Sequence, residues 1–224
     1  MVCLTSNKID TKLVSEALKA LGKDNFALII HGSSFPSKDG EDTGFGTFNS
    51  AAGRDVIDYA HGIFNALQLG PAGKSSDSSP YCGTIFSGNP LFIDLKQLTE
   101  KKWDNILSQE TFEKVVAGNP NQNKGKTAYS YIIKAQNEAL KEAWKNFKEI
   151  HGGLFGSSLK KEFDKFKKEN SFWLDNDSLY EALSIENDND FWYTWKNEAD
   201  KKLMNPKSEE EKKAYAARIE EIRN

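Results

Sequence analysis

The sequence predicts an α/β fold in which a pair of parallel strands comes first and helices follow. Two mostly apolar runs, residues 26–30 and 63–69, are typical of buried strands in a parallel sheet. Between them, apolar side chains recur at helical spacing from residue 51, directly after Ser50, which can cap a helix. Strand, loop, helix and strand in this order indicate a right-handed βαβ unit.

Helical periodicity is expected on both sides of the strand pair. Residues 11–21 form one helix, for which Gly22 is the expected C-cap. The pattern at 127–151 predicts a long helix whose buried side carries Ile132, Ala139, Ala143, Trp144, Phe147 and Ile150. Shorter helices are expected at 95–107, 158–168, 177–185, 190–204 and 205–224, with Asp177 and Asp190 as caps and Pro206 near the first turn of the last one.

Composition excludes several classes of function. The 224 residues carry 30 Lys and Arg against 33 Asp and Glu, a net charge of -3, which argues against nucleic acid or an anionic membrane as partner. Two cysteines and three scattered histidines predict no metal site, and no cofactor is expected. The first residues do not resemble a secretory signal and no apolar run could span a bilayer, so a cytoplasmic protein is expected.

Two polar loops, residues 32–50 and 78–95, follow the two expected strands. Ligands of α/β folds bind in the loops at the carboxyl ends of parallel strands. Tyr81 stands alone among Ser, Gly, Pro and Asn residues, where its ring can stack on the apolar face of a sugar while the neighbouring Ser and Asn side chains hydrogen-bond its hydroxyls. The alternative is that Tyr81 packs against a neighbouring helix.

Three stretches resemble the 4-alpha-glucanotransferases, the amylomaltase or disproportionating-enzyme family. They are "SSFPS" with "GFGTF" in the first loop, "LGPAG…SPY…NPLFIDL" in the second, and "FDKFKKENSFWLDNDSLYEAL" further on. The resemblance spans about residues 26–198 in the order of the family, and the combination in the second loop is specific.

The resemblance implies a (β/α)8 TIM-type barrel with an early helical insertion, of which this chain holds an incomplete part. Residues 1–98 would be the first two β/α units with the substrate-cleft loops, and residues 99–224 the α-helical insertion. The family transfers alpha-1,4-glucan segments with retention, which needs two carboxyl groups about 5–5.5 Å apart. These lie beyond the matched positions, so no catalytic residue is assigned. Tyr81 and Ser79 are the expected substrate-binding residues, whereas Asn89 and Asp94 shape the loop.

The expected function is therefore that of a 4-alpha-glucanotransferase-like protein of starch, glycogen or maltodextrin metabolism. This chain would supply glucan-binding loops without the catalytic carboxylates. The alternatives are a non-catalytic glucan-binding protein derived from the family, and an unrelated α/β enzyme that uses its own Asp residues. For Asp175 and Asp177, two apart before an expected helix, capping is favoured over an acid/base pair. The expected partners are an alpha-1,4-glucan and, because an open strand pair exposes its edges, a complementing C-terminal chain or a second copy.

Overall fold

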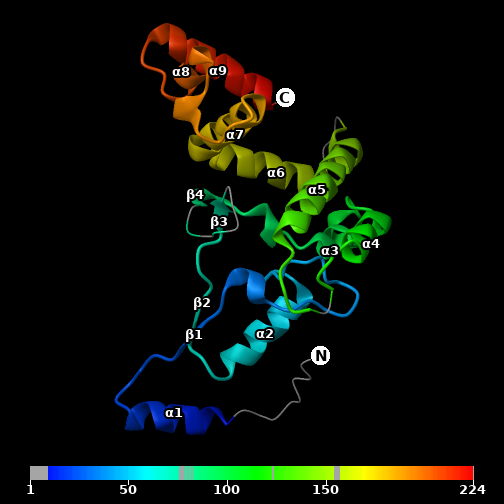
Figure 1. The fold of residues 1–224 in the computed structure, drawn as a ribbon, viewed down its shortest axis with the longest axis vertical. Coiled ribbons are helices and arrows are strands. Elements are labelled where there is room, and N and C mark those ends of the chain that lie inside the picture. Colours follow the sequence, from blue (N-terminus) through cyan, green and yellow to red (C-terminus); the bar gives the residue numbers. More distant parts are fainter. Residues whose placement is uncertain are drawn as a thin grey trace. The chain divides into compact units, whose positions relative to one another are not determined.

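A computed structural model describes residues 10–75, 79, 81, 83–122, 124–153 and 157–223 (Figure 1). These residues fall into two compact units. Unit 1 comprises the chain up to Gly83 together with Gly88–Ile150, and unit 2 comprises Thr84–Ser87 and the chain from His151 onward. The division into barrel units and insertion at residue 98 stays a prediction.

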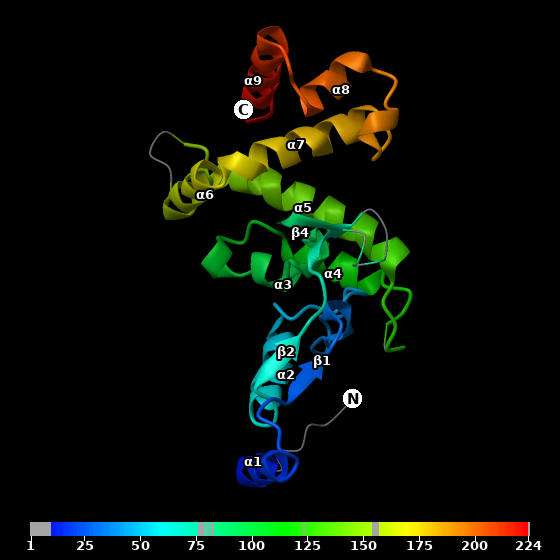
Figure 2. The same ribbon diagram turned by 90° about the vertical axis from the view of Figure 1, so that its left-hand side faces the viewer.

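The first strands of unit 1 in the sequence form a two-stranded parallel sheet. Strand β1 (Ala27–Ile29) pairs with β2 (Ala66–Gln68), with Leu28 opposite Leu67, and the two lie side by side in Figure 2. Helix α2 (Ala51–His61) joins the two strands, and the Ser50 hydroxyl accepts a hydrogen bond from its first turn. The predicted order of strand, helix and parallel strand is confirmed.

The two strands are much less buried than their apolar sequences predict. Ile29 exposes 73% of its surface, and the residues at both ends of each strand are exposed, while Leu28 and Leu67 are half-buried. In the part of the chain that the structure describes, neither strand has a second neighbour in its sheet. Sheets gain independent stability from three or more strands, so this pair by itself contributes little stability.

Helix α1 (Thr11–Ala20) begins and ends as its sequence predicts. The Asp10 carboxylate caps its start by accepting the backbone N–H groups of Lys12 and Leu13 at 3.0 and 3.1 Å. At its end Gly22 adopts a positive φ of 61°, and the N–H of Lys23 donates to the Leu18 carbonyl at 2.9 Å. This is a Schellman motif, which confirms the C-capping role of Gly22.

The core of unit 1 is built around α5 (Tyr129–His151), the long helix expected at 127–151. It packs near α3 (Leu95–Leu98) and α4 (Gln109–Ala117) in Figure 1. The buried apolar residues of these helices and their connections are Leu95, Ile106, Leu107, Phe112, Val115, Val116, Ile132, Ala139, Ala143 and Phe147. The expectation that Trp144 and Ile150 belong to this buried side is wrong: both are about half exposed, and Trp144 stacks on the Phe147 ring from outside.

Unit 2 has a core of its own. Its helices are α6 (Ser158–Glu169), α7 (Ser171–Glu186), α8 (Glu198–Met204) and α9 (Glu209–Arg223), coloured yellow to red in Figure 1. Leu179, Leu183, Trp195 and Ile219 are buried together, and Tyr180, Leu203, Met204, Tyr215 and Ile222 pack against them. The last helix, α9, thus faces this core with Tyr215, Ile219 and Ile222. Of the helices that the structure describes, none is long and apolar enough to cross a membrane.

Several expected helix starts in unit 2 are wrong. Asp177 does not cap a helix, because α7 already begins at Ser171, and the Asp177 carboxylate instead accepts the Ser87 hydroxyl. Asp190 does not cap either, because the neighbouring Asn189 carboxamide accepts the N–H of Phe191 and forms a turn there.

The expected helix over 190–204 is divided into two. A short 3-10 turn, η5 (Trp192–Thr194), comes first, and Asn197 then caps α8. Pro206 lies outside α9, which begins with a capping box: the N–H of Glu211 donates to the Ser208 hydroxyl, and the Glu211 carboxylate accepts the N–H of Ser208.

Candidate functional site

The loop after β1 is held by short-range hydrogen bonds around His31. The imidazole Nδ1 accepts the N–H of Ser33 at 3.3 Å and lies 2.7 Å from the Ser33 hydroxyl oxygen. From α5, the Tyr129 hydroxyl donates to the same oxygen at 3.1 Å. His31 therefore has a structural role, because it shapes the turn η1 (Gly32–Ser34).

The two polar loops that follow the strands are joined at Phe92. Thr47 and Asn49 of the first loop both donate to the Phe92 carbonyl, at 3.0 and 2.9 Å. The Phe92 ring lies 5.3 Å from the ring of Phe45 and 5.1 Å from that of Phe48. Sequence segments that carry the two separate motifs are thus packed into one layer of unit 1.

Asn89 and Asp94 shape the second loop, as expected. The Asn89 carboxamide accepts the N–H of Leu91 at 3.0 Å and caps the turn η3 (Pro90–Phe92). The Asp94 carboxylate accepts the N–H of Lys96 at 3.1 Å and caps α3. The carboxamide of Gln136 on α5 donates to the carbonyls of Pro90 and Ile93, so this segment is fixed from both sides.

Tyr81 and Ser79 lie between two antiparallel strands, β3 (Gly73–Ser75) and β4 (Gly83–Gly88). Tyr81 exposes 77% of its surface, so it does not pack against a neighbouring helix, and Ser79 is half-buried. This strand pair was not predicted, although "TIF", a run of β-branched and aromatic residues in "GTIFSG", is the signal that could have revealed it. Residues 76–78, 80 and 82 of the same motif lie outside the described residues.

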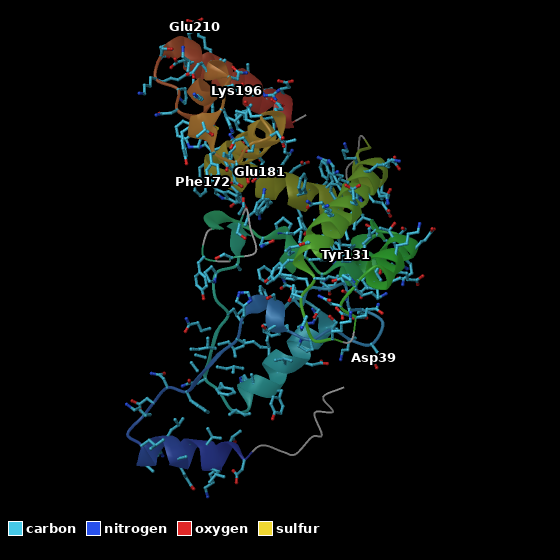
Figure 3. The ribbon with its side chains drawn as sticks, viewed as in Figure 1. Asp39, Tyr131, Phe172, Glu181, Lys196 and Glu210 are labelled. Atoms are coloured by element: carbon cyan, nitrogen blue, oxygen red, sulfur yellow. The ribbon has the colours of Figure 1, made fainter. Side chains whose placement is uncertain are left out.

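A cavity of about 700 Å³ lies within unit 1, beside the loop that follows β1. One wall is formed by residues 33–40, 42 and 44–46, including Asp39, which Figure 3 labels on this loop. The other wall is formed by Val116, Gln122 and residues 125–127. The lining contributes hydroxyl, amide, carboxylate and ammonium groups together with two aromatic side chains, Phe35 and Phe45. This lining is more polar than that of a typical small-molecule site, which is mostly apolar.

Tyr131 fixes the second wall of the cavity. Its hydroxyl, on α5 (Figure 3), donates to the Val115 carbonyl at 2.6 Å, next to Val116 of the wall. Burial raises the pKa of this hydroxyl, so it stays protonated as a donor. Neither Ser79 nor Tyr81 is among the residues that line the cavity. The structure therefore describes two separate features, an exposed Tyr81 and a cavity at the first loop.

The family model for 4-alpha-glucanotransferase matches residues 30–223. The chain belongs to the 4-alpha-glucanotransferase family. A 4-alpha-glucanotransferase of Clostridium butyricum is 32% identical over 172 residues, which is 74% of this chain and 31% of that relative. The 4-alpha-glucanotransferase of Aquifex aeolicus is 25% identical over 176 residues, again 31% of its length. The resemblance inferred from the motifs is confirmed, and this member of the family spans about a third of the length of the curated relatives it matches.

A solved structure agrees with this placement. Amylomaltase from Streptococcus agalactiae in complex with acarbose superposes with a TM-score of 0.65 at 20% identity, covering 89% of this chain and 37% of the amylomaltase. At that identity the likeness shows the fold alone. The chain therefore has the fold of the corresponding part of an amylomaltase.

Proposed function

We propose that this chain binds alpha-1,4-glucan and represents the front part of a 4-alpha-glucanotransferase. In this proposal β1 and β2 are the first two barrel strands, residues 1–98 carry the cleft loops, and residues 99–224 form the helical insertion. Family membership over residues 30–223 supports the ligand class. The observation that supports this location of the binding site is the exposure of Tyr81 in the "SPY" motif. Tyr81 leaves 77% of its surface accessible. The setting is the cytoplasmic glucan metabolism expected from the sequence.

The role proposed for each residue follows from its chemistry. The Tyr81 ring offers a flat apolar surface to the C–H face of a glucose unit, and the Ser79 hydroxyl both donates to and accepts from sugar hydroxyls. The two carboxyl groups of the retaining reaction are proposed to lie on the barrel strands that follow the portion matched here. The same chain without that continuation would act as a glucan-binding protein, the alternative function.

Replacing Tyr81 should weaken glucan binding without affecting stability. We expect Tyr81→Ala to raise the Kd for maltoheptaose about fivefold, since loss of a stacking contact costs about 1 kcal/mol. Isothermal titration calorimetry on the full chain measures this change. Tyr59→Ala, which removes an exposed tyrosine on α2 outside both loops, is the matched control and should leave the Kd unchanged. Equal Kd values for both variants and the unmodified chain would contradict the role of Tyr81.

The same preparations test the placement of the catalytic carboxyl groups. The chain incubated with maltotriose should release no glucose and form no longer oligomers, because the proposal assigns the nucleophile and the acid/base to other strands. If the homogeneous protein still converts maltotriose, the catalytic carboxyl groups lie within these 224 residues, and the proposed placement is wrong.

The open strand pair predicts association. An apolar, unpaired strand edge is a template for another strand, so we expect the chain to form dimers or larger species unless the rest of a barrel covers β1 and β2. Light scattering on a dilution series measures this, and Ile29→Lys should shift the distribution toward the monomer. Leu21→Lys, on an equally exposed apolar residue after α1, is the control and should change it little. A well-behaved monomer of the unmodified chain would overturn this expectation.

A further inference from the structure

Unit 2 exposes three consecutive aromatic side chains in the connection between α7 and α8. Phe191, Trp192 and Tyr193 leave 60%, 38% and 63% of their surfaces accessible. The ring of Tyr193 lies 6.0 Å from that of Phe191 and 6.3 Å from that of Trp192, so the three form one patch. A contiguous exposed patch of large apolar groups marks a binding surface more often than isolated exposed residues do.

The turn that carries this patch is rigidly held. The Asn189 carboxamide accepts the N–H of Phe191 and donates to the Thr194 hydroxyl, both at 2.8 Å. Below it, the indole of buried Trp195 donates to the Asn189 carbonyl at 2.6 Å. Because the side chains of a pre-ordered turn lose little further freedom on binding, an exposed ring in this position is suited to contact a ligand.

A cavity of about 350 Å³ lies against Trp192. Its other lining residues come from α8, its C-terminal turn and the start of α9: Lys201, Lys202, Asn205, Lys207 and Glu211. The volume falls at the lower end of the range of small-molecule pockets, about 300–1,000 Å³. An aromatic ring thus stands at the edge of a space otherwise surrounded by hydrogen-bonding groups.

The polar groups of this cavity include both donors and acceptors. The pKa of Glu211 lies below its ordinary value because its carboxylate accepts the backbone N–H groups of Ser208 and Lys207, so it is an ionised acceptor. Lys202 is 3.7 Å from that carboxylate. Lys201 is paired with Glu198 at 2.7 Å, which offsets its charge. Within residues 157–223, the exposed Asn205 carboxamide has no hydrogen-bond partner, so its donors and acceptors are available to a ligand.

We propose that Trp192 and this cavity form a second alpha-1,4-glucan site, on unit 2 and separate from the loop of Tyr81. The glucan as ligand rests on the proposed function. Its C–H faces suit the Trp192 ring, and its hydroxyl groups suit Asn205, Lys202 and Glu211, because a neutral polyhydroxylated ligand needs donors and acceptors together. The pairing of two of the three lysines with carboxylates favours this neutral ligand over an anion.

The test follows individual indole signals by NMR in the full chain, which has five tryptophans. The Trp192 signal, assigned with Trp192→Phe, should shift on addition of maltoheptaose, while that of Trp144, a half-exposed tryptophan in unit 1, should not. Asn205→Ala should weaken the titration of the Trp192 signal about fivefold. Phe172→Ala removes an exposed ring of unit 2 that does not line the cavity (Figure 3), and it should leave the titration unchanged.

The two glucan sites are separated by repeating the titration in Tyr81→Ala. A Trp192 shift that persists there supports the second site whether or not Tyr81 binds glucan. The second site is overturned if maltoheptaose does not shift the Trp192 signal although calorimetry shows that the chain binds it through Tyr81. That outcome leaves the proposed function intact. Reversal of the Trp192 shift by excess inorganic phosphate, or equal effects of Asn205→Ala and Phe172→Ala, would also overturn the second site.

Discussion

Trp195→Ala is expected to destabilise unit 2 by about 4 kcal/mol. Trp195 exposes 1% of its surface and is packed with Leu179, Leu183 and Ile219. Removing it leaves a large cavity among these side chains and takes away the indole donor of the Asn189 carbonyl. Urea unfolding followed by circular dichroism measures the loss.

Two further variants separate the causes of this loss. Trp195→Phe keeps most of the apolar volume but removes the indole N–H, so it should cost less, about 2 kcal/mol. Phe172→Ala, at an exposed position on α7 of the same unit, should change stability by less than about 0.5 kcal/mol. If Trp195→Ala were as mild as Phe172→Ala, Trp195 would not be a core residue.

Gly46→Ala is expected to disrupt the loop after β1 at a cost of about 3 kcal/mol. A Cβ atom at this position would lie 1.9 Å from the Phe35 carbonyl oxygen and 2.9 Å from the Ser33 carbonyl oxygen. Both are backbone atoms, so relief requires the chain on one side to move rather than a side chain to rotate. Because Ser33, Phe35 and Gly46 all line the cavity of unit 1, its shape should be lost together with stability.

Gly88→Ala is the matched control for this substitution. Gly88 also lies in unit 1, but a Cβ atom added there has open space around it. Thermal unfolding of the two variants should therefore differ, with the melting temperature lowered by several degrees only for Gly46→Ala. Equal melting temperatures would show that the close approach of Gly46 to Phe35 is not maintained in solution.

Local sequence signals were sufficient to predict the helices whose ends and faces are set by residues nearby in the sequence. The spacing of apolar residues and the caps Ser50 and Gly22 placed α2 and α1, and the periodicity from Ile132 onward placed α5. The same signals failed where several neighbouring polar side chains can cap the same helix or turn. Asn189, rather than Asp190, forms the turn before η5, and α7 begins upstream of Asp177. In both places several polar residues could cap, and the sequence alone does not rank them.

The candidate site was only partly predictable. The exposure of Tyr81 followed from its polar surroundings, and the loop-shaping roles of Asn89 and Asp94 followed from the motif that they share. The cavity was missed because its second wall, around Gln122 and Lys126, comes from a distant turn that only tertiary packing brings to the first loop. The pocket beside Trp192 was missed because the turn between α8 and α9, which brings Lys207 and Glu211 to Trp192, was expected to be part of one helix over 205–224.

The core of unit 2 is drawn from a short stretch of the chain, Leu179 to Ile219. Contacts between residues that are near in sequence close small loops, which favours rapid assembly. By contrast, β1 and β2 are separated by a whole helix, and the pair lacks further strands in the described residues. During synthesis, the helices of unit 2 could therefore fold soon after they leave the ribosome. The strand pair, although synthesised first, would keep its apolar edges exposed for longer and would be more prone to bind chaperones.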